Sequence, residues 1–175
     1  MKILMVQGKK VLNTLLKNKQ YEADFYHTKY LEDYAVTAYQ ILMKYLDYKT
    51  VPIFGCIFDR FSSFHGTHAT KGSVILELDV PDELVTIQYF YGWLDFQSSI
   101  FYLKPKPETA YHQQISYSFD PDLTHNSCMF TVQAVLPYIK PEWFVCAYKY
   151  DHEFIQSFSG DVRLEECLLN KLMRI

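Results

Sequence analysis

The residues best suited to chemistry lie in one stretch of the first half of the chain. Arg60, one of only three arginines, is followed by His65 and His68 in a segment rich in Gly, Ser and Thr. Phosphoester cleavage requires one group that acts as a base, a second that acts as an acid, and a cation that stabilises the pentavalent anion. One hypothesis is therefore an RNA- or nucleotide-directed enzyme, of ribonuclease or phosphoesterase type, with His65, His68 and Arg60 as catalytic residues.

The same residues also fit a simpler interpretation, a surface loop whose histidines contact solvent. Phosphoesterases built on His-x-Thr motifs carry two separated copies, whereas here His65-Gly66-Thr67 is followed at once by His68-Ala69-Thr70 and no second copy lies a fold's length away. Two histidines three residues apart can share a metal ion, but the spacing sets no third ligand. We therefore expect no metal site and no cofactor.

Other enzyme classes leave weaker traces. A transferase of ADP-ribose uses an early Arg or His on a strand and a late Glu, but no arginine precedes Arg60 and the late glutamates have no flanking signature. This class is a distant third hypothesis. A nucleophile elbow, a phosphate-binding loop and a dinucleotide fingerprint are all missing, because the six glycines never cluster.

The charge of the chain favours a basic partner over nucleic acid. There are 17 basic and 20 acidic side chains, which gives a formal charge of −3. Nucleic-acid binders usually carry a basic stripe and an excess of positive charge, and this sequence has neither. A basic protein is the electrostatically easier partner for an acidic surface.

Aromatic residues are unusually frequent, at 17% of the chain with 15 tyrosines. Tyrosine is enriched at recognition surfaces because it presents a large apolar body and a polar tip. Asp79, Asp82 and Glu83 end the strongest predicted strand, and Tyr89 and Tyr91 follow shortly after. We expect these five side chains to contact a partner.

Cysteine usage and hydropathy favour a cytoplasmic protein. The four cysteines form no Cys-x-x-Cys pair, so we expect free and mostly buried thiols rather than a zinc ribbon or a redox dithiol. No secretory signal is recognisable at the start. No apolar run reaches the roughly 18 residues that a membrane span needs, so we expect no membrane association.

The elements that must position these residues alternate without strict β-α-β order. Strands are predicted at 2–7, 53–58, 73–80, 84–88, 128–139 and 143–150, and helices at 9–18, 30–48, 89–103 and about 161–174. Polar residues alternate with apolar ones over 73–80, as in a half-buried strand, and Asp120-Pro121-Asp122 has the composition of a turn. The pattern predicts a single α+β domain over 1–175, with a mainly antiparallel twisted sheet flanked by helices.

Three regions of the chain resemble one protein family. They are the opening Ile-Leu-Met-Val-Gln strand at 3–7, the Val-Pro-Asp-Glu turn at 80–83 ahead of Trp93, and the Gln-containing strand pair between 132 and 150. Together they resemble a bacterial domain-of-unknown-function family, numbered 3841. That family has no assigned activity, so the resemblance implies a fold unit over most of residues 1–150 and no reaction.

Two functional hypotheses follow from these patterns. The first is a small intracellular accessory protein, of the kind that phages and mobile elements encode, which binds and inhibits a larger nucleic-acid-handling effector. A basic host protein such as an RNA-guided nuclease would be its partner, which makes the chain an anti-CRISPR-like inhibitor. The alternative is the enzyme centred on His65, His68 and Arg60, in which RNA is the partner.

Overall fold

One antiparallel sheet organises the protein. The computed structural model describes residues 1–26, 32–57, 73–102, 108–126 and 132–149. The strands are β1 (Lys2–Gly8), β2 (Ile53–Ile57), β3 (Ser73–Asp79), β4 (Thr86–Tyr89), β5 (Val132–Leu136) and β6 (Phe144–Lys149). They form a six-stranded sheet in the order β4-β5-β2-β1-β3-β6, in which every neighbouring pair is antiparallel.

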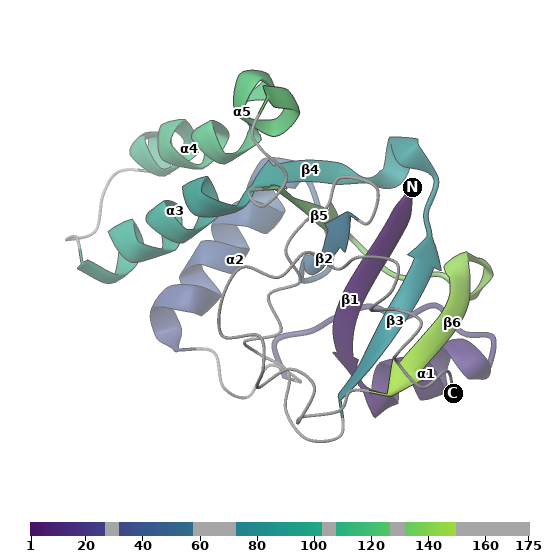
Figure 1. The fold of residues 1–175 in the computed structure, drawn as a ribbon. Helices are drawn as coiled ribbons and strands as arrows, with labels where there is room; N and C mark the ends of the chain where they lie inside the picture. The colour runs from purple at the N-terminus through teal and green to yellow at the C-terminus, as the bar shows by residue number, and fades with distance from the viewer. Residues whose placement is uncertain (27–31, 58–72, 103–107, 127–131, 150–175) are drawn as a thin grey trace.

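Helices flank this sheet, which confirms the predicted α+β fold. They are α1 (Lys9–Leu16), α2 (Asp33–Leu46), α3 (Phe90–Tyr102), α4 (Glu108–Ser116) and α5 (Pro121–Asn126), with short 3-10 turns η3 (Asp82–Leu84), η4 (Tyr117–Phe119) and η5 (Pro141–Trp143). In Figure 1, α1 lies at the β3–β6 end of the sheet, and α2 to α5 gather at the β4–β5 end.

Two hydrophobic cores form on opposite faces of the sheet, because successive side chains of a strand point to opposite sides. Ile53 of β2 joins Ile3 and the buried side of α1 in the first core. Its neighbour Phe54 packs against the second core, which α2, α3 and α4 build around Trp93 and Phe96. The helices α2, α3 and α4 therefore cover the face of the sheet opposite to the one that α1 covers.

Two sequence predictions were wrong. The predicted half-buried strand at 73–80 is covered on both faces, since Val74 to Leu78 are all buried, including Glu77. Val74, Leu76 and Leu78 belong to the first core on one face. On both faces the side chains of β1 and β6 lie beside those of β3, because β3 is an interior strand. The predicted turn at Asp120-Pro121-Asp122 instead begins α5, because Asp120 accepts the Asp122 backbone N–H at 2.8 Å and Pro121 occupies the first helical position.

The other predicted strands and helices that fall on described residues agree with the structure to within a few residues. The segment from 108 to 119, for which the sequence predicts no element, forms α4 and η4. The predicted helix at about 161–174 lies outside the described residues. Within the described parts of the chain, no helix is long and apolar enough to cross a membrane. Cys56 and Cys146, the two cysteines that the structure describes, are thiols and are not joined in a disulfide.

Candidate protein-docking surface

The residues of the predicted catalytic loop lie outside the described residues. Arg60, His65 and His68 belong to the range 58–72, so the enzyme hypothesis receives no geometric test. Among the residues that the structure does describe, no group of three or more His, Cys, Asp or Glu side chains could hold a metal ion. The candidate site is therefore built from the five predicted partner-binding residues and their neighbours.

These five residues divide into two groups at opposite ends of β4. Asp79, Asp82 and Glu83 precede the strand, whereas Tyr89 ends it and Tyr91 lies in the first turn of α3. Four residues of strand extend about 13 Å. The acidic group and the tyrosine pair are therefore two separate sites.

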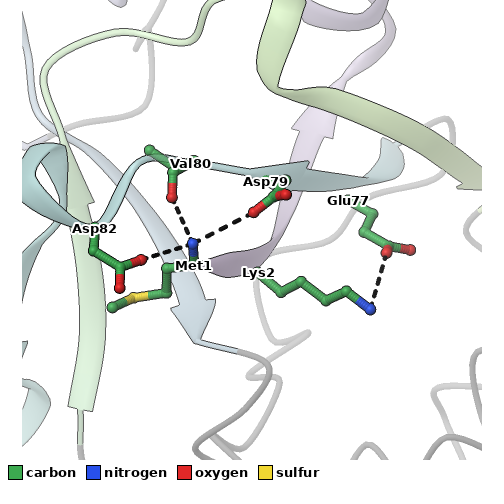
Figure 2. A network of polar contacts seen from close by, with 6 residues as sticks. All are labelled: Met1, Lys2, Glu77, Asp79, Val80 and Asp82. Atoms are coloured by element: carbon green, nitrogen blue, oxygen red, sulfur yellow. Dashed lines mark hydrogen bonds and ion pairs between the residues drawn. The ribbon is translucent and has the colours of Figure 1, made fainter.

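The two aspartates of the acidic group contact the amino group of Met1. Figure 2 shows the Met1 amino group directed at Asp82 Oδ1 at 2.8 Å, at Asp79 Oδ1 at 3.4 Å and at the Val80 carbonyl oxygen at 2.6 Å. The hydrogen bond to Asp82 is the main cause that raises the pKa of this amino group. Both aspartates stay exposed to solvent, but part of their charge is already compensated. The acidic group is the weaker candidate for partner binding.

The tyrosine pair is extended by a third ring from a distant part of the chain. The ring centroids of Tyr89 and Tyr91 lie 6.1 Å apart, and those of Tyr89 and Tyr117 lie 6.2 Å apart, with steep interplanar angles in both pairs. Such edge-to-face packing is a favourable arrangement of aromatic rings. Tyr91 is 47% and Tyr117 is 51% exposed. The pair predicted from sequence is thus part of a solvent-facing cluster of three tyrosines.

A close approach of two backbones holds this cluster together. A Cβ on Gly92 would meet the Ser118 Cα at 3.0 Å, so the absence of a side chain there lets η4 pack directly on α3. Each residue of this contact is preceded by an exposed tyrosine, Tyr91 or Tyr117. The close contact between Gly92 and Ser118 therefore brings Tyr91 and Tyr117 to the same side of the molecule, beside Tyr89.

Buried side-chain hydrogen bonds tie the same contact to the sheet. Gln133 Nε2 of β5 donates to Gln88 Oε1 at 2.7 Å, Gln88 Nε2 donates to Ser118 Oγ at 3.2 Å, and Ser118 Oγ donates to the Ile115 carbonyl oxygen at 2.8 Å. Gln88 and Ser118 are fully buried. Satisfied buried networks of this kind fix one arrangement. The tyrosine cluster consequently rests on a rigid support.

Exposed apolar side chains continue from this cluster along α3. Leu94 is 39%, Phe101 52% and Tyr102 78% exposed, while Trp93 and Phe96 on the other side of the helix are buried in the second core. A helix that is apolar on most of its circumference is normally enclosed. We call the exposed set the α3 surface; it consists of Tyr91, Leu94, Phe101, Tyr102 and Tyr117.

The α3 surface lies in the most acidic part of the chain. Between Ser73 and Ile139 the sequence has eight Asp and Glu residues but only two lysines. None of α3, α4, η4 and α5 carries a Lys or Arg. Asp95 lies on α3, and Asp120 and Asp122 follow η4 directly. Exposed aromatic rings on elements that carry carboxylates and no Lys or Arg suit a partner rich in Lys and Arg.

A second polar cluster is buried at the other end of the sheet. The Glu77 Oε2 atom of β3 accepts the Tyr148 hydroxyl at 2.5 Å and the Cys146 thiol at 3.3 Å, and Oε1 lies 3.9 Å from Lys2 Nζ (Figure 2). Burial is the first cause that raises the pKa of Tyr148, followed by its hydrogen bonds to Cys146 and Glu77. These contacts join β1, β3 and β6, so we assign the cluster to stability.

Sequence reasoning missed Tyr117, because 26 residues separate it from Tyr91 and no local period relates them. The composition of α3, which is apolar around most of the helix, is the signal that could have marked the surface. Comparison of the chain with protein-family models, with curated proteins and with solved structures finds no significant match. The resemblance to the numbered family therefore stays a prediction.

Proposed function

We propose that this protein is a non-catalytic binding protein that docks onto a basic surface of a larger protein through the α3 surface. The observation that carries the proposal is the presence of exposed aromatic and aliphatic side chains on α3 and η4, within a part of the chain that has almost no cations. Several exposed apolar side chains grouped on neighbouring elements are typical of an interaction site. The surrounding carboxylates select the sign of the partner's charge.

A nucleic-acid-handling effector is the partner class that best fits this chemistry. Such proteins carry Lys and Arg surfaces that neutralise phosphates. An acidic protein that occupies such a surface competes with the nucleic acid for the same cations. The expected consequence is inhibition, as in an anti-CRISPR-like protein acting on an RNA-guided nuclease.

A direct test is complex formation with purified basic effectors. The protein is mixed with RNA-guided nucleases loaded with guide, and complex formation is followed by size-exclusion chromatography and by titration. We expect a complex that Tyr91→Ser/Tyr117→Ser weakens by about tenfold or more, because central aromatic residues carry most interface energy. Tyr26→Ser is the matched control, since Tyr26 is 76% exposed and lies outside the α3 surface.

Three results would contradict the proposal. The first is equal weakening by the control and by the double variant, and the second is no complex with any of the effectors tested. The third is cleavage of a labelled structured RNA by the protein alone, seen on a denaturing gel and lost in His65→Ala/His68→Ala. Cleavage of that kind would establish the ribonuclease alternative, with Arg60 as its anion-stabilising residue.

A further inference from the structure

We infer that the α3 surface receives a basic amphipathic helix of the partner, with apolar residues on one side and Lys or Arg residues flanking them. This inference rests on the proposed function and adds the shape of the binding element. Its support comes from the spacing of the exposed residues, the rigidity of α3 and the distribution of charge around it.

The exposed residues of α3 follow a row that a second helix can match. Tyr91, Leu94, Ser98 and Tyr102 are exposed and are spaced three or four residues apart, as on one side of a helix. Rows of this spacing form the ridges that pack into the grooves of a neighbouring helix. At about 1.5 Å per residue, the row from Tyr91 to Tyr102 is about 17 Å long. Ser98 is the smallest side chain of the row, and it leaves space for a large apolar side chain of the partner.

The support beneath the row is already ordered, so little entropy is lost on docking. Trp93 and Phe96 contact each other at a centroid distance of 5.8 Å, and Phe96 also contacts Tyr111 of α4 at 6.3 Å. On the exposed side, the Phe101 ring packs against Tyr34 of α2 at 4.8 Å and against Tyr102 at 4.6 Å. The large exposed rings are therefore held by neighbours instead of rotating freely.

The charges around the row select a cationic partner. Asp95 follows Leu94 directly and is exposed, and Asp122, also exposed, lies in the first turn of α5 just beyond η4. No Lys or Arg lies on α3, α4, η4 or α5. A second copy of this chain would bring the same carboxylates face to face in a symmetric contact, which is unfavourable. Nucleic acid would be repelled by the same charges.

The test uses a synthetic helix as the probe. A fluorescein-labelled peptide of about 18 residues, made of Leu and Lys with the helical period, is titrated with the protein and followed by anisotropy. The reference peptide has the same composition, with the order changed so that the period is lost. We expect the periodic peptide to bind about tenfold more tightly than the reference, which corresponds to about 1.4 kcal/mol.

Variants locate the binding on α3. Leu94→Ser/Phe101→Ser is expected to weaken binding of the periodic peptide by about tenfold or more, with circular dichroism and urea unfolding to verify that the variant is folded. Leu16→Ser is the matched control, because Leu16 is a 65% exposed leucine on α1, away from α3. Both changes are neutral, so they leave the charge of the protein unaltered. We expect the control to bind as the wild type does.

Each contrary result overturns the inference in its own way. Equal binding of the two peptides would leave docking of basic proteins intact and remove the helix as the recognised shape. If neither peptide binds but the nuclease forms a complex, the helix is likewise removed as the recognised shape. If neither the peptides nor the nuclease bind, the proposed function is overturned as well. Equal loss in Leu16→Ser would place binding elsewhere. A dimer in sedimentation equilibrium that Leu94→Ser/Phe101→Ser dissociates would make a second copy the occupant.

Discussion

A single buried carboxylate shows how much a residue's role depends on its neighbours. Glu77 is 9% exposed, and its side chain accepts hydrogen bonds from Tyr148 and Cys146. Hydrogen bonds to an ionised group stabilise a fold more than neutral ones do, and losing one leaves buried charge less well solvated. Removal of a single atom from this cluster should therefore change the free energy of unfolding.

Removal of the Tyr148 hydroxyl tests the hydrogen bond to Glu77 with the smallest change in shape. Tyr148→Phe keeps the ring but deletes the donor to Glu77 Oε2, so we expect the free energy of unfolding to fall by about 1.5–3 kcal/mol. Urea unfolding followed by circular dichroism measures it. Tyr102→Phe is the control, since Tyr102 is 78% exposed and its loss of a hydroxyl should change stability little. Equal effects of the two changes would mean that the Glu77 contact contributes nothing.

Tyr39 gives a prediction about alkaline pH. Burial raises the pKa of Tyr39 from 10.0 to about 12. The unfolded chain therefore releases this proton at lower pH than the folded chain does. The contribution of Tyr39 to the free energy of unfolding is fully present below pH 10 and is lost as the pH rises toward 12. Tyr39→Phe should remove part of this decline. Urea unfolding at several pH values between 9 and 12 compares the two slopes, and identical slopes would contradict the prediction.

At the scale of elements, the contact between α3 and η4 is what creates the docking surface. Gly92 lets the two backbones approach, and the Gln88–Ser118 hydrogen bond fixes them to β4. Tyr89 and Tyr91 are close in sequence, but Tyr117 reaches them only through this contact. The surface should therefore be sensitive to a methyl group at one buried position.

Gly92→Ala tests this contact. The added Cβ would lie 3.0 Å from the Ser118 Cα, which has to move. Helix propensity favours alanine by about 1 kcal/mol, whereas overpacking costs about 1–3 kcal/mol. We expect a net loss of about 1 kcal/mol in urea unfolding and weaker binding of the basic peptide, because Tyr117 shifts with Ser118.

The matched control for this change is Gly8→Ala, because a Cβ on Gly8 has no heavy atom within 4 Å. That variant should stay close to the wild type in stability, because the entropy lost by the unfolded chain offsets the poorer N-cap that alanine gives α1. If Gly92→Ala binds the peptide as the wild type does, the position of Tyr117 is unimportant for docking.

At the scale of the whole molecule, charge is distributed unevenly along a chain whose net charge of −3 is modest. The acidic residues between Ser73 and Ile139 include those beside the α3 surface. Such asymmetry steers an oppositely charged partner toward one face and mainly raises the association rate. The net charge alone does not reveal this uneven distribution of charge.

The rate of association provides the corresponding prediction. Asp95→Asn/Asp122→Asn should lower the association rate constant of the basic peptide by about threefold to tenfold at low salt, with a smaller change in dissociation. Stopped-flow anisotropy measures both rates. Glu22→Gln/Glu142→Gln removes the same charge from other exposed positions and should change the rate less. Raising the salt concentration should bring all variants together, because screening shortens the range of these charges.

Local patterns in the sequence determined most of the secondary structure. The apolar period predicted α2 and α3 and the strand character of β1 and β6 to within a few residues, because these patterns reflect neighbours three, four or two positions apart. The antiparallel α+β fold followed from the order of the elements. The turn predicted at Pro121 was wrong because the same residues that favour turns also begin helices.

The tertiary structure alone decided which residues meet. It paired β3 with β6, where Tyr148 and Cys146 contact the buried Glu77. It also separated Asp82 from Tyr89 by the length of β4 and brought Tyr117 to the tyrosine pair. These outcomes depend on strand order and on backbone contacts between residues far apart in sequence. A local period in the sequence does not reveal such contacts. The sequence therefore determined that tyrosines and carboxylates are abundant, and the packing of η4 on α3 decided which of them form one surface.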